Sequence, residues 1–450
     1  MAKRQNRISQ GKSAGLSAMS KTLPRAIRTA LPLVFLAAAI IAITNDCSEA
    51  VFTIKPAIAL SEEFDDNIYL TRKDRVSDYI TRVLPSVSMN YKAPIWDWTL
   101  DYTLIWWYYA KLRKGETSHD LKLTSKVNVI NNLLYLDIND IYSNVVIDPR
   151  APSTQTNLSV NRTDTNTLTV SPYFKYQLTP AMALSAGYRY SNIWYRDATA
   201  ISRKMHTGFA TVDYMVTPQV TASMSAEYVA DRPERPEPNN DQKAVFSKVL
   251  YKMNPRMDLD ATLGYRWYKF DVGPAGHSVS RPIYGAGLIY RISDTGRIEF
   301  RVGSTFTTSP DLGVLESRTE QITVRYGEAL SIDGSIFHRK DTYVGTTTSG
   351  AGTTGFGITS KEDVYGITAG LQYKYNQRLT FRGSGKYEKD RFLVEDEGEN
   401  NIFSGSAGID YKLTPKATLT LTYNHTREGG RTRDLEYTDN VIAVQLHMTF

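Results

Sequence analysis

The chain has 450 residues, of which 53 are Lys or Arg and 47 are Asp or Glu, and its formal net charge is +6. Seven of the basic residues and two of the acidic ones lie in the first 50 residues, which leaves 46 basic and 45 acidic residues in the rest. Because the chain beyond residue 50 is close to neutral, its charge gives no argument for nucleic-acid binding.

The first 50 residues predict a signal peptide. Basic residues precede an unbroken apolar run at 31–43, which is too short for a bilayer-spanning helix and typical of a signal-peptide core. The small residues Ser48 and Ala50 predict cleavage after Ala50, and a short N-terminal membrane anchor is the alternative. The single cysteine, Cys47, lies in this segment, so residues 51–450 fit export without disulfides.

The remaining chain carries a strand pattern with one apolar and one polar face. From Trp96 to Ala110 the even positions are apolar or aromatic, and aspartates and threonines stand between them. The same period-two alternation returns within residues 168–178, 257–268, 298–302 and 418–423. Strands of about ten residues with this pattern are typical of a transmembrane β-barrel.

A repeated turn motif separates these strands. The copies are YQLTP (Tyr176–Pro180), YMVTP (Tyr214–Pro218), YKMNP (Tyr251–Pro255) and YKLTP (Tyr411–Pro415), with looser copies at 290–294 and 373–377. The tyrosines at 176, 214, 251 and 290 lie 37 to 39 residues apart, which indicates a repeated hairpin unit. Proline cannot donate to a ladder and belongs in the turn, and a tyrosine before the turn suits an aromatic girdle.

The connections between these units are long and polar, at 144–164, 230–242 and 344–363. Short turns on one side and long loops on the other are typical of outer-membrane barrels. We therefore predict an all-β fold at 51–450, a single antiparallel transmembrane β-barrel of roughly 18–20 strands. The turns are expected in the periplasm and the loops outside the cell.

The end of the chain predicts how the barrel closes. From Ile442 to Phe450 every second residue is apolar. Because lipid cannot satisfy an open sheet edge, the last strand is expected to pair with the first. Leu446, Met448 and Phe450 resemble the C-terminal signal that the barrel assembly machinery reads, which makes that machinery an expected partner. A soluble β-sandwich is the alternative.

No motif predicts a catalytic, cofactor-binding or metal site, so we expect no enzyme and no cofactor. The six histidines are scattered without metal-ligand spacing. The stretch GHSVS (Gly276–Ser280) lacks the context of a nucleophile elbow. The acidic stretch at Ser61–Asn67 could bind Ca²⁺ but fails the EF-hand spacing, and a solvated acidic bend is the simpler interpretation.

The polar strand faces predict a water-filled lumen. The charged residues on these faces could pair across the wall and stabilise it, or set the field for a hydrophilic solute. Tyrosines on the same face, Tyr109, Tyr173 and Tyr268, could stack on sugar rings. The candidate pore-lining residues are Asp97, Asp101, Lys175, Arg189, Asp258, Asp260, Arg266, Arg297, Glu299, Arg301, Arg325, Arg382, Lys386 and Glu388.

The segment Ile54–Leu112 resembles the start of a family of outer-membrane β-barrel porins (porin type two). The resemblance is carried by DDNIYL (Asp65–Leu70), SDYIT (Ser77–Thr81) and LPSVS (Leu84–Ser88). It covers about sixty residues specifically, and the rest of the chain only through its barrel pattern. Members of this family accompany exopolysaccharide loci and exosortase systems, and the family supplies no catalytic residues.

The resemblance implies a porin-like channel in the outer membrane of a Gram-negative bacterium, serving as a passive conduit associated with exopolysaccharide export. Outer-membrane lipids and periplasmic polysaccharide-export proteins are the expected partners. A general small-solute diffusion porin is the first alternative. A non-conducting scaffold or an enzyme barrel is the second.

Overall fold

The structure, a computed structural model, describes residues 50–148, 151–154, 156–234, 237–272, 276–309, 313–348, 354–393, 398–430 and 436–450. The predicted signal peptide, residues 1–50, lies outside the described residues except for Ala50. In the described part of the chain, no helix has the length and hydrophobicity needed to cross a bilayer.

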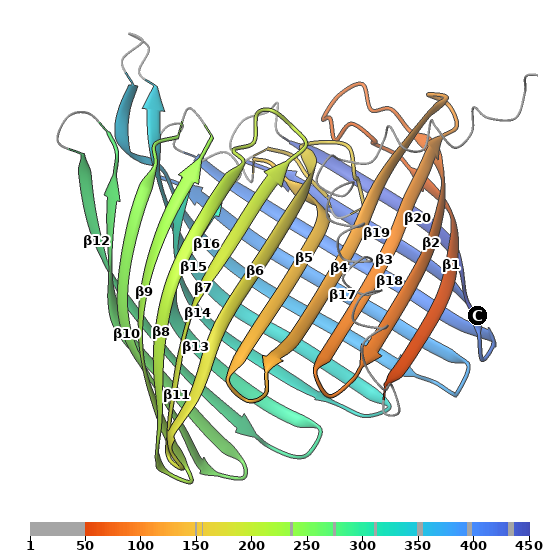
Figure 1. The fold of residues 1–450 in the computed structure, drawn as a ribbon. Coiled ribbons are helices and arrows are strands. Elements are labelled where there is room, and N and C mark those ends of the chain that lie inside the picture. The colour runs from red at the N-terminus through yellow and green to blue at the C-terminus, as the bar shows by residue number, and fades with distance from the viewer. Residues whose placement is uncertain are drawn as a thin grey trace, which may run out of the picture. The chain divides into compact units, whose positions relative to one another are not determined.

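Residues 51–450 form a closed antiparallel barrel of 20 described strands, which confirms the predicted fold class (Figure 1). Each strand pairs with the next along the chain, and the last pairs with the first. The strands are β1 Val51–Asp65, β2 Asp78–Lys92, β3 Trp96–Tyr109, β4 Lys114–Ile130, β5 Leu134–Val146, β6 Arg162–Thr179, β7 Met182–Tyr195, β8 Arg203–Thr217, β9 Val220–Pro233, β10 Asn240–Asn254, β11 Met257–Phe270, β12 His277–Arg291, β13 Gly296–Ser309, β14 Gly313–Gly327, β15 Leu330–Thr348, β16 Thr354–Lys374, β17 Leu379–Phe392, β18 Gly398–Thr414, β19 Ala417–Gly429 and β20 Tyr437–Thr449.

The connections divide between the two ends of the barrel. The odd-to-even connections, such as β1–β2 and β5–β6, lie at one end, which we call the loop end (Figure 1). The even-to-odd connections, such as β6–β7, lie at the other end, which we call the turn end. Because the strand number is even, β1 begins and β20 ends at the turn end.

The repeated turn motif has a local physical cause. Its prolines follow the last residues of β6, β8, β10 and β18, as the sequence predicts. The residue before each proline accepts a backbone hydrogen bond two residues on: Ala181 N donates to Thr179 Oγ1 at 3.3 Å, and Arg256 N donates to Asn254 Oδ1 at 2.9 Å. Short oxygen-bearing side chains favour such turns, and the register shifts by one residue just before them.

The prediction was wrong about strand length. The strands have 13 to 21 residues rather than about ten. Much of the stretch 344–363 belongs to β15 and β16, and β9 and β10 take both ends of 230–242. A strand pair can continue into water beyond the bilayer, because the ladder satisfies its backbone groups on either side of that boundary.

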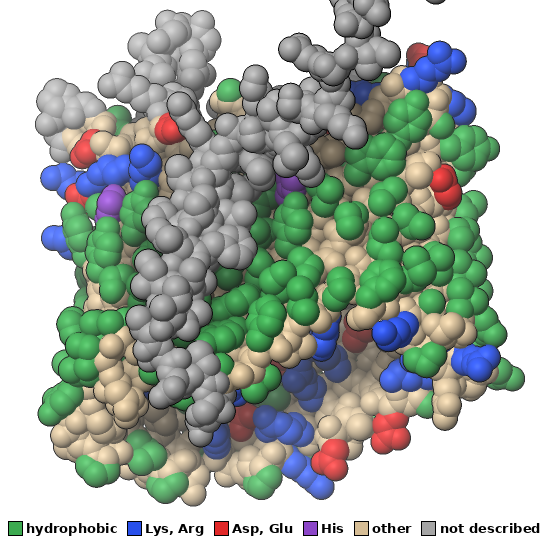
Figure 2. Space-filling view, turned by 45° about the vertical axis from the view of Figure 1, so that its right-hand side comes forward, with side chains coloured by type: hydrophobic (Ala, Val, Ile, Leu, Met, Phe, Trp, Pro, Cys, Tyr) green, Lys and Arg blue, Asp and Glu red, His purple; other side chains and the backbone are tan. Residues whose placement is uncertain are grey.

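The outer face of the barrel is apolar. Side chains that stand exposed on it include Leu263 (70%), Ile336 (61%) and Met224 (59%). In Figure 2, hydrophobic side chains cover the wall between the two ends, and charged side chains gather toward the ends. Such a band is the lipid-facing surface that the alternating sequence predicts.

The first and last strands close the wall. Their register runs from Ala57 opposite Thr449 to Asp65 opposite Val441. Phe450 N adds a bond to Pro56 O at 3.0 Å. This pairing confirms the predicted closure. It places Ile442, Val444 and Phe450 among the exposed hydrophobic residues.

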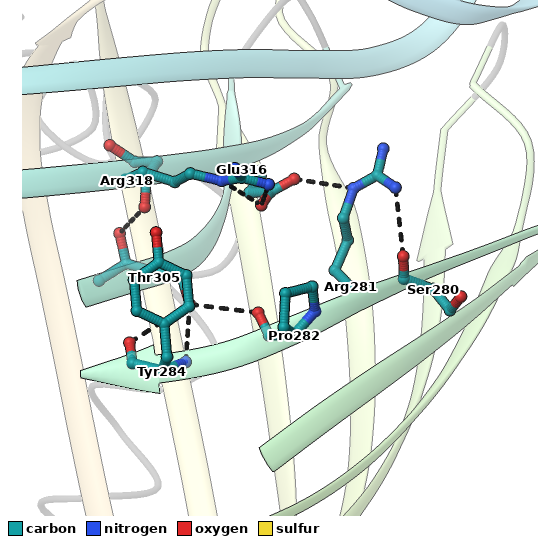
Figure 3. Close-up of polar contacts among 9 residues, drawn as sticks. Ser280, Arg281, Pro282, Tyr284, Thr305, Glu316 and Arg318 are labelled. Atoms are coloured by element: carbon teal, nitrogen blue, oxygen red, sulfur yellow. Dashed lines mark hydrogen bonds and ion pairs between the residues drawn. The ribbon is translucent and has the colours of Figure 1, made fainter. Parts of the chain in front are cut away.

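The ladder between β12 and β13 is shorter than the ladders on either side of it. We call each contact between two neighbouring strands a joint of the wall. β12 and β13 pair only along 285–291 and 297–303, so the loop-end half of β12 has no ladder with β13. Side chains bridge this part (Figure 3): Tyr284 N donates to Ser304 Oγ at 3.2 Å, and Ser304 Oγ donates to Pro282 O at 3.3 Å. Arg281 Nε donates to Glu316 of β14 at 2.8 Å. Pro282 itself offers no N–H to a ladder.

We predict that Leu263→Lys lowers the free energy of unfolding by about 2–4 kcal/mol, because it places a charge at mid-strand on the lipid-facing surface. The measurement is a urea titration of the protein folded in lipid vesicles. The control is Thr262→Lys, one residue away on the inner face, which should cost far less. Equal losses for the two variants would mean that the outer face does not contact hydrocarbon.

Candidate functional site

The loop between β1 and β2, residues 66–77, folds into the barrel. Ile68 and Leu70 are only 3% and 2% exposed, although they belong to a loop. Ile68 packs against Ile80, Trp107 and Tyr109, whose strands direct them to the inside. Burial of these apolar groups stabilises the inward position of the loop.

Asn67 fixes the conformation of this loop. Its Nδ2 donates to Thr71 O at 2.7 Å and to Thr438 O at 2.9 Å, and its Oδ1 accepts from Thr71 N at 3.0 Å. The side chain is fully buried, so each of these bonds replaces one with water. The loop is thereby tied both to itself and to β20.

The loop between β5 and β6, residues 147–161, also reaches inward, as its described residues show. Asn157 Nδ2 donates to Ile68 O at 2.7 Å, and Arg82 Nη2 donates to Thr156 O at 2.7 Å. Tyr437 Oη donates to Ser153 O at 2.9 Å. These partners lie on β2, β20 and the first loop, so the two loops meet inside the loop end and narrow it.

Buried charge at the loop end is mostly acidic. Among the described residues, ten acids and one arginine are buried, and all lie in the loop-end half of their strands. The arginine is Arg203, whose Nη1 lies 2.8 Å from Asp231 Oδ2. The acids are Asp65, Asp78, Asp164, Asp231, Glu316, Asp341, Glu362, Glu388, Glu428 and Asp439.

Several of these acids have cationic partners, but one group of them faces other acids. Asp164 pairs with Arg196, and Asp341 pairs with Arg339. Glu428 accepts a hydrogen bond from Asn400 at 2.9 Å, and the charged group acting on it is the carboxylate of Asp390. The inner wall along β17, β19, β20 and β1 is therefore acidic.

A further acid lies in the connection between β7 and β8. Thr199 donates from its backbone N and from its Oγ1 to Asp197 Oδ1, each at 2.8 Å. These two bonds lower the pKa of Asp197 below its ordinary value. The loop end thus keeps this negative charge down to acidic pH.

The structure places all 14 predicted pore-lining residues on the inner face, where they alternate with the exposed apolar residues of the outer face. Most of them lie toward the turn end. Many of them form ion pairs along one strand or between strands. Lys386 pairs with Glu388 within β17, and Arg301 pairs with Glu299 within β13 and with Asp260 of β11. Arg382 of β17 pairs with Asp410 of β18 at 2.7 Å. Arg266 contacts Glu227 at 3.5 Å, and Asp258 contacts Arg291 at 2.5 Å.

These pairs support the expectation that the charges stabilise the wall. That the residues line a conducting pore stays a prediction. For Asp97, Asp101, Lys175, Arg189, Arg297 and Arg325, no ion pair occurs among the described residues.

The prediction for the inner tyrosines was wrong in two cases of three. Tyr109 is 6% exposed beneath the inward loops, and Tyr268 is 4% exposed and packs with Phe270. Neither can stack on a solute. Tyr173 is half-buried and stacks on Tyr135, with 5.3 Å between ring centroids.

Comparison with known proteins agrees with the fold. Residues 363–450 match the family described as "Putative beta-barrel porin 2". This match supports the porin family. The matched residues include β17 to β20 and residues 363–374 of β16. The motifs that suggested the resemblance lie elsewhere, at 54–112. A search of curated proteins found no match.

Solved structures with a similar fold include an iron transporter and a ferric enterobactin receptor. The FrpB iron transporter of Neisseria meningitidis, in its apoprotein form, has a TM-score of 0.52 and 9% identity, over 88% of this chain and 81% of that one. A mutant ferric enterobactin receptor, PfeA of Pseudomonas aeruginosa, has a TM-score of 0.51 and 9% identity, over 88% and 80%. At this identity the likeness shows the porin-like barrel fold alone.

We predict that Asn157→Ala loosens the inward loop. The substitution leaves Ile68 O and the backbone N–H groups of Ser159 and Val160 without their partner, which costs about 1–3 kcal/mol. Cleavage within residues 147–161 by a protease should become about 5-fold to 100-fold faster, as followed by mass spectrometry. The control is Asn401→Ala, which removes a bond to Tyr387 on the outer face. An unchanged cleavage rate would contradict the inward position.

Proposed function

We propose that the chain is a passive channel for hydrophilic solutes in the outer membrane of a Gram-negative bacterium. The porin family match and the fold of outer-membrane receptors support the location. A barrel of 20 strands encloses enough space for an aqueous lumen, and its inner face carries the polar side chains such a lumen needs.

The observation that carries the proposal in detail is the acidic inner wall at the loop end. Buried carboxylates in a narrow, partly dehydrated passage act on a passing ion more strongly than the same charges in bulk water. Where the two inward loops narrow the lumen, cations and neutral solutes therefore pass more readily than anions.

We predict that Glu428→Gln lowers the cation preference of the channel. The amide keeps the bond from Asn400 but removes a carboxyl that no described cation neutralises. Burial raises the pKa of Glu428 to about 7, so the comparison is made above that pH, where the carboxyl is ionised. A unit charge about 4 Å from an ion in water is worth about 1 kcal/mol, so the cation-to-anion permeability ratio should fall by up to about fivefold. The measurement is the reversal potential of single channels in a KCl gradient.

The matched control is Glu399→Gln, the same substitution at the loop end of β18 but on the outer face, beside Lys389 and Arg391. Its selectivity should equal that of the wild type. An anion-selective wild type would overturn the proposed selectivity. A barrel that inserts without any conductance step would instead favour a non-conducting scaffold.

A second candidate is a conduit for exopolysaccharide that works with periplasmic export proteins. The family resemblance supports it. So does the inward pair of Tyr135 and Tyr173, which offers an aromatic face to a sugar ring, with Lys126 Nζ 5.3 Å from the Tyr135 ring. An acidic loop end suits a neutral or basic polymer better than an acidic one.

We predict that deletion of the gene reduces secreted polysaccharide and that expression of the wild-type chain restores it. Tyr173→Ala, which leaves Tyr135 in place, should restore it only in part. Secretion of polysaccharide at the wild-type level in the deletion strain would exclude this second candidate, while leaving the diffusion channel unaffected. Polymer is measured in the culture supernatant at equal cell density.

The C-terminal strand also keeps its proposed role in assembly. Leu446 and Met448 lie on the outer face of β20, Phe450 directly follows this strand, and β20 is the closing strand. We infer that the barrel assembly machinery recognises this strand before β1 pairs with it. Catalysis and cofactor binding form no part of the proposal.

A further inference from the structure

Three carboxylates meet at the loop end of the closing joint between β1 and β20. Asp65 is the last residue of β1, Asp66 follows it, and Asp439 lies near the start of β20. One oxygen from each lies within 4.8 Å of the other two. Asp65 is 3% exposed, Asp439 is 2% exposed, and Asp66 is half-buried.

Two of these acids have polar partners, and one oxygen of the third has none. Asp65 Oδ1 accepts from Asn67 N at 2.7 Å. Asp66 accepts from the backbone N and the Nδ2 of Asn440, at 2.8 and 2.7 Å. Asp439 Oδ1 is buried without any hydrogen-bond partner. A buried carboxylate oxygen that lacks a donor is costly, and this one belongs to the group of three.

No direct ion pair compensates the three charges. Among the described residues, no Lys or Arg lies within 4.0 Å of these carboxylates. Arg75 and Arg82 act on the group from a longer range. Arg82 is already engaged by Glu63 at 2.9 Å and by Thr156 O. The remaining compensation must come from a bound cation or a bound proton.

We propose that Asp65, Asp66 and Asp439 bind a Ca²⁺ ion that joins the first strand of the barrel to the last. Ca²⁺ takes carboxylate oxygens in flexible geometry, whereas Mg²⁺ requires a near-ideal octahedron. The three acids come from two strands and a bend, an arrangement that suits the more tolerant ion. An ion here neutralises the repulsion and satisfies Asp439 Oδ1. It also links residues 373 positions apart in the sequence, such as Asp66 and Asp439.

The ion-binding test uses the full chain, folded in a detergent free of lipopolysaccharide so that no lipid phosphate competes for the metal. After treatment with EDTA, isothermal titration with CaCl₂ should show one site per chain. Extracellular Ca²⁺ sites have dissociation constants of about 0.1–1 mM, so half-saturation is expected in that range. Thermal unfolding should shift upward by several degrees over the same concentrations.

The variant Asp439→Asn gives the proposal a distinctive signature. In EDTA it should be at least as stable as the wild type, because the repulsion is relieved. In CaCl₂ the order should reverse, because only the wild type gains from the ion. A second variant, Asp66→Asn, keeps both buried acids and should weaken Ca²⁺ binding at least tenfold. It replaces Asp439→Asn in the test if that variant fails to fold. The control, Asp213→Asn, removes a distant carboxylate that accepts from Ser223 and should bind Ca²⁺ like the wild type.

Three outcomes would overturn the proposal. The wild type shows no heat of Ca²⁺ binding and no thermal shift, which identifies a proton shared between Asp65 and Asp439 instead. Mg²⁺ produces the same shift as Ca²⁺ at equal concentration, which indicates general ionic screening. The variants Asp439→Asn and Asp66→Asn both keep the wild-type affinity, which places the ion elsewhere. The site does not depend on whether the barrel conducts.

Discussion

The backbone hydrogen bonds of a strand cannot be left open in hydrocarbon, and the rest of this structure depends on that constraint. Each unpaired N–H or C=O in lipid costs several kcal/mol, so a sheet with two free edges is excluded from the bilayer. The chain meets the constraint by pairing Ala57–Asp65 with Val441–Thr449. Once the wall is closed, alternation alone divides the side chains into an apolar outer set and a polar inner set.

Features that repeat locally could be predicted from the sequence. The turn motif fixes the turn end residue by residue, because Thr179 or Asn254 caps its own turn and the next proline cannot enter a strand. Alternation likewise assigned each predicted pore-lining residue to the inner face. Strand length could not be predicted in this way, because a ladder continues wherever its backbone groups find partners, and Gly- or Thr-rich segments such as 344–348 and 354–363 do so.

Contacts between segments that are distant along the chain could not be predicted from the sequence. Nothing near Asn157 indicates that its amide meets Ile68, 89 positions away, or that Tyr109 is covered by both loops. Of the ten buried acids at the loop end, the sequence indicated only Glu388, as a pore-lining residue, and Asp65, within the acidic stretch 61–67. A weak signal exists for others, because Asp78, Asp231 and Glu428 all stand at strand termini next to connections. Acids at strand termini can be interpreted only when the strand register is known, because the register shows that these termini surround one opening of the barrel.

The inner wall therefore has two regions of different character. Toward the turn end, opposite charges such as those of Arg382 and Asp410 pair across strands and cancel. Toward the loop end, buried carboxylates outnumber buried cations, and two loops reach inward. In the proposed channel a solute would meet the acidic field where the two loops narrow the lumen, which separates the structural role of the paired charges from any selective role of the unpaired ones.

The short ladder between β12 and β13 has a mechanical consequence. Seven register pairs hold this joint, fewer than the nine that hold the two ends of the chain together. Beyond the ladder, the Ser304 hydroxyl donates to Pro282 O in place of a backbone N–H. The joint with the fewest ladder hydrogen bonds needs the least free energy to open. Local opening of the barrel wall will thus begin between β12 and β13 rather than where the termini meet, and amide exchange at residues 285–291, whose ladder crosses this joint, is the place to observe it.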